Sequence, residues 1–111
     1  MIDTEVLQQR IKQLNEALED AQTDCKKAYW FYKNTKDNMI SYQQFYNQQK
    51  DNLNDKGIKE GKEQIKNFRE ASKIAYDSYL QLVKRVSFIE GGIETLSLLL
   101  EDHLGIIQDV A

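Results

Sequence analysis

Few residues of this 111-residue chain are of types that do chemistry, and none stands in a pattern that chemistry requires. The only histidine, His103, and the only cysteine, Cys25, both fall where apolar residues recur at helical spacing. Such positions are typical of packed side chains rather than of metal ligands or reactive thiols. Zinc sites need clustered Cys and His, and di-metal helical bundles need Glu-x-x-His pairs, but the sequence has neither. We therefore predict no metal site and no cofactor.

The remaining polar candidates also lack partners. Glu90 and Glu94 lie one helical turn apart on a solvated face, where like charges repel rather than share a proton. Ser72, Thr35 and Thr95 have no base nearby that could activate a hydroxyl. A phosphate-binding glycine loop is absent as well. These observations predict no catalytic residue, so the protein is expected not to be an enzyme.

Basic and aromatic residues alternate between Lys26 and Lys36, a pattern found in proteins that bind single-stranded nucleic acid. Asp24 and Asp37 dilute this patch, and the chain as a whole has a net charge of −3 without a dense basic stripe. A nucleic-acid-binding regulator is therefore the least favoured function. The charge is uneven: residues 86–111 hold five acids and no base, which suits oriented docking on another protein.

The elements that position these residues are two predicted helices. Each has a seam, which is the line of apolar residues that recurs every three or four positions along one face of the helix. Proline is absent, and apolar residues recur every three or four positions from Leu7 to Tyr46, which predicts a helix over about residues 4–50 with Asp3 or Thr4 as its cap. A second series runs from Ile65 to Val110 and predicts a helix over about residues 58–109. This series passes through Gly91 and Gly92. Three roles stay open for this pair: a hinge, a site where another helix approaches closely, or two glycines that the helix tolerates.

Asparagine, aspartate and glycine between Asp51 and Gly57 interrupt the pattern and predict a turn over about residues 51–60. Gly57 is expected to end the first helix in the left-handed conformation. The fold class is therefore all-α: residues 1–111 form one coiled-coil-like hairpin of two long antiparallel helices. Facing residues are expected to have numbers that add up to about 110–115, given antiparallel seams around this turn.

The chain carries more apolar surface than one seam needs. Trp30 occupies an outward position of the first helix, and the last third is apolar around most of its circumference. We predict a protein-partner interface made of Trp30, Phe31, Leu98, Leu99, Leu104 and Ile106. Two alternatives remain open: Trp30 lies along the stem of Lys26, Lys27 or Lys33, or a curved first helix covers the terminal apolar residues. The expected partner is a helical region of a larger protein, or a second copy that completes a bundle.

A membrane role is not expected. No run of about twenty apolar residues exists, and the polar face of the last third is acidic where membrane-surface helices are basic. We therefore predict no stable membrane insertion. Residues 1–5 have neither the basic flank nor the apolar core of a signal peptide. The expected location is the cytoplasm, and export without a cleaved signal peptide stays open.

With about a hundred residues, two long predicted helices, a short central turn and no signal peptide, the chain resembles the Trp-x-Gly family of small type VII secretion proteins. It is more similar to the small helical partners of LXG toxins, which generally lack the Trp-x-Gly turn. The resemblance covers nearly the whole chain and is one of architecture. The turn reads Asp55-Lys56-Gly57 without Trp, and the aromatic-x-x-x-acid export signal is missing, because Gly92 follows Phe88 at the fourth position.

The resemblance implies a non-enzymatic adaptor, chaperone or targeting factor that joins a helical region of a larger effector, and it carries over no functional residue. Helical hairpins are used by many unrelated proteins. The alternative function is a self-assembling four-helix-bundle protein of phage or cytoskeletal type.

Overall fold

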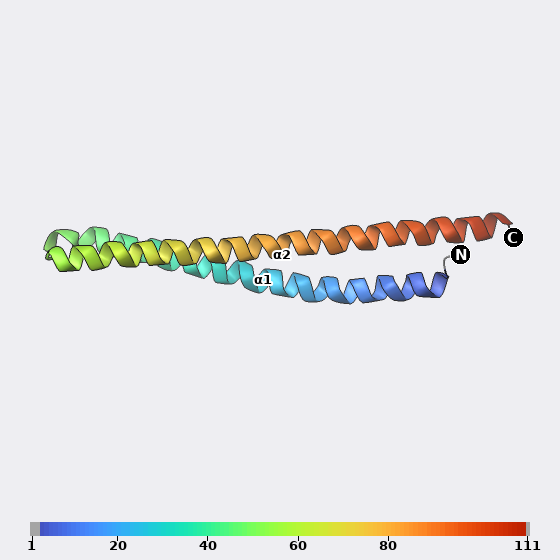
Figure 1. Cartoon of the computed structure of the whole chain (residues 1–111), viewed down its shortest axis with the longest axis horizontal. Helices are drawn as coiled ribbons and strands as arrows, with labels where there is room; N and C mark the ends of the chain where they lie inside the picture. Colours follow the sequence, from blue (N-terminus) through green and yellow to red (C-terminus); the bar gives the residue numbers. More distant parts are fainter. Residues whose placement is uncertain (1–2, 111) are drawn as a thin grey trace. The chain divides into compact units, whose positions relative to one another are not determined.

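The computed structural model describes the backbone of residues 3–110 and the side chains of residues 3–105. Helix α1 spans Thr4–Gln49, a short 3-10 helix η1 spans Lys50–Asn52, and helix α2 spans Asp55–Val110 (Figure 1). No strand occurs among the described residues. The predicted all-α class with two long helices is therefore confirmed. The predicted ends lie within three residues of those observed, and the largest difference is that α2 begins at Asp55 rather than near residue 58.

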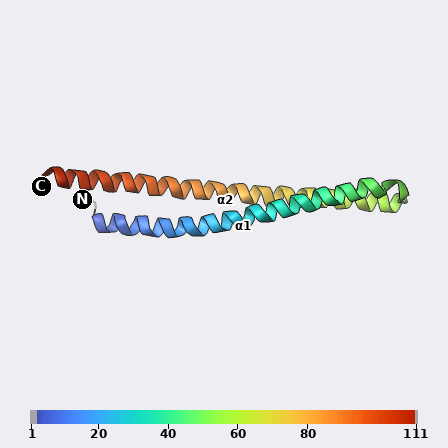
Figure 2. The same ribbon diagram turned by 180° about the vertical axis from the view of Figure 1, so that it is seen from behind.

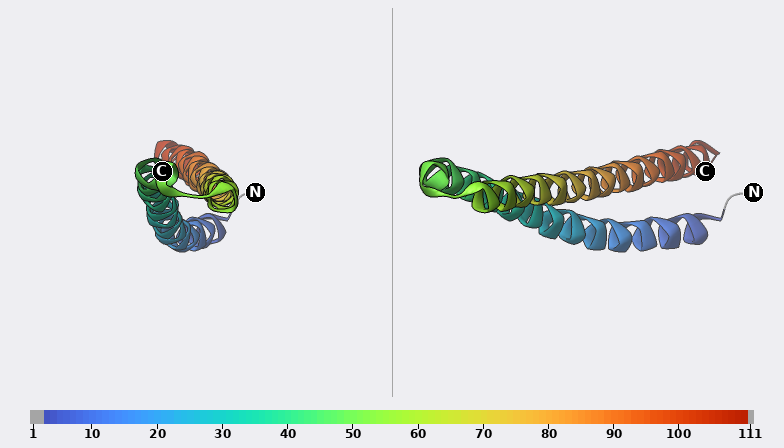
Figure 3. Two further views of the ribbon diagram at one scale, coloured as in Figure 1. Left: turned by 90° about the vertical axis from the view of Figure 1, so that its left-hand side faces the viewer. Right: turned by 60° about the vertical axis from the view of Figure 1, so that its left-hand side comes forward.

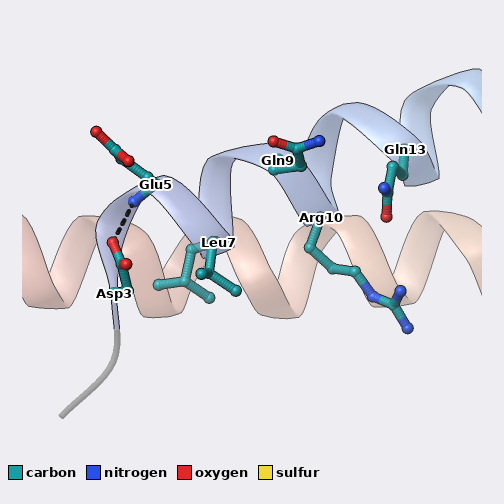
Figure 4. Close-up of a pocket in the computed structure, with 7 residues that line it drawn as sticks. Asp3, Glu5, Leu7, Gln9, Arg10 and Gln13 are labelled. Atoms are coloured by element: carbon teal, nitrogen blue, oxygen red, sulfur yellow. Dashed lines mark hydrogen bonds between the residues drawn. The ribbon is translucent and has the colours of Figure 1, made fainter.

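Asp3 caps α1. One carboxylate oxygen of Asp3 accepts a hydrogen bond from the backbone N–H of Glu5 at 2.9 Å, and the Asp3 carbonyl accepts one from Leu7 N–H at 3.1 Å (Figure 4). The acid in the first turn, Glu5, also lies near the positive end of the helix dipole. Of the two predicted caps, Asp3 rather than Thr4 satisfies the free N–H groups at this end.

The turn differs from its prediction at Gly57, which does not end α1 in the left-handed conformation. No described residue has a positive φ, and Gly57 lies in the first turn of α2, where its N–H donates to the Asn54 side-chain oxygen at 2.8 Å. The physical reason is that Asn54 caps α2. The chain leaves α1 through the tighter 3-10 turn and then becomes extended at Leu53, with φ −94° and ψ 147°.

The structure contains two compact units, which we describe separately. Unit 1 combines Met1–Cys25 of the chain with Leu82–Ala111, and unit 2 is the continuous stretch Lys26–Gln81. In unit 2 the end of α1 and the start of α2 lie side by side and run in opposite directions from the turn, as seen from two sides in Figures 1 and 2. Figure 3 shows the connection at the closed end of unit 2.

Unit 2 is held together by aromatic rings that meet across the two helices. The ring centroids of Tyr32 and Tyr76 are 5.1 Å apart, those of Tyr42 and Phe68 are 5.3 Å apart, and those of Tyr29 and Tyr79 are 5.6 Å apart. Separations of this size are favourable for tilted aromatic pairs. The residue numbers of each pair add up to 108 or 110, at or just below the predicted range, because α2 begins earlier than predicted.

Close to the turn, the ring of Tyr46 lies directly against the backbone of Gly61. Tyr46 is 8% exposed, and a Cβ atom added to Gly61 would overlap its ring carbons. The Tyr46 hydroxyl also reaches the carbonyl oxygen of Ile58, at 3.5 Å. A glycine is needed at position 61 because only a residue without a side chain lets the ring come this close.

Unit 1 is held together by aliphatic residues. Leu7, Ala21 and Ile89 are buried, and Leu14 packs toward Gly92, whose added Cβ would lie 3.7 Å from the Leu14 Cδ1 atom. Every predicted seam residue from Leu7 to His103 is buried or half-buried, including Cys25 and His103 themselves. The predicted seams are therefore confirmed along both helices, except at Ile107 and Val110, which lie outside the described side chains.

Candidate partner interface

Trp30 lies on the surface of unit 2 with 49% of the residue exposed. The Lys33 ammonium stands 5.0 Å from the centre of its ring, and the Tyr29 ring meets it edge-on at 5.6 Å. A cation–π contact at an exposed site contributes about 0.5–1 kcal/mol. The contact with Lys33 agrees with one predicted alternative, that Trp30 lies along a lysine stem. It also holds the indole in place while leaving a large part of it free for another chain.

The second predicted residue of unit 2, Phe31, is 66% exposed, although it follows Trp30 directly on α1. Together with Tyr29, which is 40% exposed, it extends the apolar surface around one helical turn. We call Tyr29, Trp30 and Phe31 the aromatic face. Sequence reasoning missed further exposed apolar residues of unit 2. These are Ile40, Phe45, Leu53, Ile74 and Tyr76.

The predicted apolar residues of unit 1 are also open to solvent. Leu98, Leu99 and Leu104 are 54%, 41% and 39% exposed, so α1 does not cover them. The side chain of Ile106, the last residue of the predicted interface, lies outside the described side chains. Exposed leucines in such numbers on one helix are typical of a surface that another chain covers.

The most exposed large apolar residue is one that sequence reasoning missed. Phe88 is 83% exposed and borders an apolar depression of about 510 Å³ in unit 1. The depression forms where Gly91 and Gly92 remove two side chains from the surface of α2. Its lining residues are Leu14, Ser87, Phe88, Gly91, Gly92, Thr95 and Leu96, and we call them the glycine groove. Phe88 could have been identified from the sequence alone. Position 88 lies between the seam positions Val86 and Ile89 but is not itself a seam position, so its side chain is expected to point away from the seam.

A second depression, of about 570 Å³, lies at the start of α1 (Figure 4). Its lining residues are Asp3, Glu5, Val6, Leu7, Gln9, Arg10 and Gln13. These residues lie at the start and in the first turns of α1, and in Figure 4 the Gln9 side chain lies against the α1 ribbon whereas the Arg10 side chain extends away from it, so the two do not converge on a point. The arrangement offers a shallow surface and no shared position for a reacting atom.

Groups that could do chemistry are engaged locally or set apart. The hydroxyls of Thr35 and Thr95 donate to the carbonyls of Phe31 and Gly91, one turn back on the same helix, at 2.8 and 2.9 Å. No group of three or more His, Cys, Asp or Glu among the described residues could hold a metal ion. Within the same residues, neither helix is long and apolar enough to span a membrane.

Charge is divided sharply between the two units. Unit 1 contains eleven acidic and four basic residues, a net charge of −7, whereas unit 2 contains seven acidic and eleven basic residues, a net charge of +4. The two values recover the net charge of −3 for the whole chain. Among the described side chains the one ion pair is between Lys56 and Glu60, at 4.0 Å.

Comparison of the chain with known protein families, curated proteins and solved structures finds no match.

Proposed function

We propose that this chain is a non-enzymatic helical partner protein that completes a bundle with a helical region of a larger protein. The observation that carries the proposal is the imbalance between core and surface. Five hydrophobic residues are buried among those described, whereas thirteen large ones are 38–83% exposed. A pair of helices with so much apolar surface is stabilised when further helices cover it.

The interface of the proposal has an aromatic part and an aliphatic part. Trp30 and Phe31 supply large anchors of the kind that dominate binding energy at protein interfaces. Leu98, Leu99 and Leu104 supply exposed apolar side chains spread around the circumference of α2, so that more than one further helix can cover them. No chemistry is asked of any side chain, in keeping with a role as adaptor, chaperone or targeting factor.

The architectural resemblance supports a specific partner class, the helical region of an LXG toxin exported by a type VII secretion system. Such a partner is expected to offer a helical region that this all-α chain can join. In this proposal the chain meets the toxin in the cytoplasm, and the pair leaves the cell without a cleaved signal peptide. The absence of a membrane-spanning helix among the described residues is compatible with this route.

The test begins with the genes beside the one for this chain, among which the proposal expects an LXG protein. It continues with co-expression of the helical region of that protein, co-purification and light scattering. We expect a stable complex with one copy of each protein. Trp30→Ala should weaken the complex by about tenfold or more, as truncation of an interface anchor does. Gln44→Ala is the matched control, because Gln44 is an exposed residue of the same helix at the same outward helical position, fourteen residues away.

A neighbouring LXG region that does not bind the wild-type chain would refute the toxin-partner assignment. Equal binding by the wild type and by the variants Trp30→Ala and Leu99→Glu would refute the interface. The two results are separable, because the first is measured on the wild type alone.

A further inference from the structure

The two units differ in surface chemistry as well as in charge. Unit 1 is acidic and contains the glycine groove, an apolar depression from which two side chains are missing. Unit 2 is basic and displays the aromatic face, from which large side chains stand out. The two units are therefore complementary in shape, because one has a depression and the other has protruding side chains, and in charge, because one is acidic and the other basic.

The local charges lean the same way as the units. On α2 around the glycine groove, four exposed acids outnumber two exposed bases: Glu90, Glu94, Glu101 and Asp102 against Lys84 and Arg85. On α1 around the aromatic face, four exposed bases outnumber two exposed acids: Lys26, Lys27, Lys33 and Lys36 against Asp24 and Asp37, with Lys33 over the Trp30 ring. Opposite charges around two apolar surfaces direct those surfaces toward each other and disfavour contacts between like units.

We infer that the acidic unit 1 of one copy docks on the basic unit 2 of a second copy, with the aromatic face covering the glycine groove. The contact is reciprocal, because each copy carries both surfaces. When both contacts form between the same two copies, the product is a closed dimer with two-fold symmetry. This inference goes beyond the proposed function, since it concerns the chain without any other protein. Because the aromatic face includes Trp30 and Phe31, the dimer contact and the partner contact exclude each other there.

A second copy fits better than an arbitrary apolar partner for a physical reason. Unit charges of −7 and +4 attract when unlike units meet, and they repel when like units meet. An unrelated helix would have to match an acidic groove or a basic aromatic face, whereas a second copy supplies the complement of both at once.

The first measurement is the mass of the purified chain by light scattering at roughly 0.1 mM, where a contact of micromolar affinity is saturated. At about 0.05 M salt, where exposed charges are weakly screened, we expect a mass of twice the 13.0 kDa of one chain. At about 1 M salt we expect a clear shift toward the monomer, because the Debye length falls to roughly 3 Å. A monomer at low salt, or a dimer indifferent to salt, would overturn the inference.

The decisive measurement is a charge exchange. Glu90→Lys with Glu94→Lys changes unit 1 from −7 to −3, and Lys26→Glu with Lys27→Glu changes unit 2 from +4 to 0. Each double variant alone should associate at least about tenfold more weakly than the wild type, because in both of its contacts the substituted pair then faces a pair with the same sign of charge. An equimolar mixture should regain the dimer, since it has one original and one reversed contact.

Docking between like units predicts that each double variant alone associates no more weakly than the wild type, because its substituted pair then faces a copy of itself, just as the original pair did. That result, or a mixture that does not regain the dimer, would overturn the inference. The fold of each variant is checked by its helix content, which these exposed substitutions should leave unchanged.

The glycine groove is tested by Gly91→Leu. A Cβ atom added at Gly91 meets no atom within 4 Å, so the chain can accept the side chain, which then fills the groove. We expect dimer dissociation to increase by about tenfold, as it does when an anchor loses its pocket. Gly105→Leu is the matched control, because Gly105 also lies in α2 with no atom within 4 Å of an added Cβ and is not part of the groove. Equal effects of the two variants would remove the groove from the interface.

Discussion

The packing of Tyr46 on Gly61 leads to a stability prediction that can be worked from the structure. In an exposed helix interior, replacing glycine by alanine stabilises the folded state by about 1 kcal/mol. At Gly91 nothing stands within 4 Å of the added Cβ, so Gly91→Ala should show this gain in full. At Gly61 the same atom would overlap the ring of Tyr46, which is only 8% exposed and has little room to move.

Overpacking of this kind costs about 1–3 kcal/mol. With the helix propensity gain of about 1 kcal/mol subtracted, Gly61→Ala should be destabilising by roughly 0–2 kcal/mol, so the two variants should differ by about 1–3 kcal/mol. The assay is urea unfolding followed by far-UV circular dichroism, which reports on helix in both units. A difference of this size moves the unfolding midpoint by about 1 M for a small protein.

Because Gly61 and Gly91 belong to different units, a reference within unit 2 is also needed. In a Tyr46→Ala background the ring is gone, and Gly61→Ala should then stabilise by about 1 kcal/mol. If Gly61→Ala stabilises the wild type as much as Gly91→Ala does, the reasoning from ring contact is wrong. If the change is equally harmful with and without the Tyr46 ring, the cost arises elsewhere.

Two further predictions concern the turn and the aromatic pairs. Asn54→Ala removes the side-chain acceptor of the Gly57 N–H, at 2.8 Å, and should destabilise the fold by about 1 kcal/mol, whereas Asn54→Asp should retain most of the stability; urea titration of both variants checks this, and equal losses would argue against a capping role. Tyr32 and Tyr76, whose ring centroids lie 5.1 Å apart, should show a coupling energy of about 0.5–1.5 kcal/mol in a double-mutant cycle with leucine, and additive losses would contradict a specific ring contact.

Much of the fold could be predicted because a seam is a repeated signal. From Leu7 to Tyr46 and from Ile65 to His103, the spacing of three or four residues is repeated many times. A single polar exception such as Thr35 therefore does not disturb the prediction. The turn was harder to place because it depends on single residues. Both Gly57 and Asn54 offer ways to end or begin a helix, and their side-chain contacts decide the outcome.

The candidate interface could be predicted only in part. Trp30, Phe31 and the three leucines were identified because they are apolar and lie off the seam. Phe88 was missed although its position off the seam indicated exposure, and the glycine groove was missed because its depth depends on how Leu14 of α1 packs beside Gly91 and Gly92 of α2. The division of charge was also obscured, because unit 1 is assembled from two segments far apart in the sequence.

The aromatic pairs of unit 2 have a practical consequence for spectroscopy. The single tryptophan and all six tyrosines lie between residues 29 and 79, and the only aromatic residue of unit 1 is Phe88. The fluorescence of tryptophan and tyrosine and their near-ultraviolet circular dichroism bands therefore originate from unit 2, while unit 1 contributes only the weak bands of Phe88. A tryptophan introduced at position 88 would provide a second reporter, placed at the edge of the glycine groove, so that the unfolding of each unit and the covering of each surface could be followed separately in one molecule.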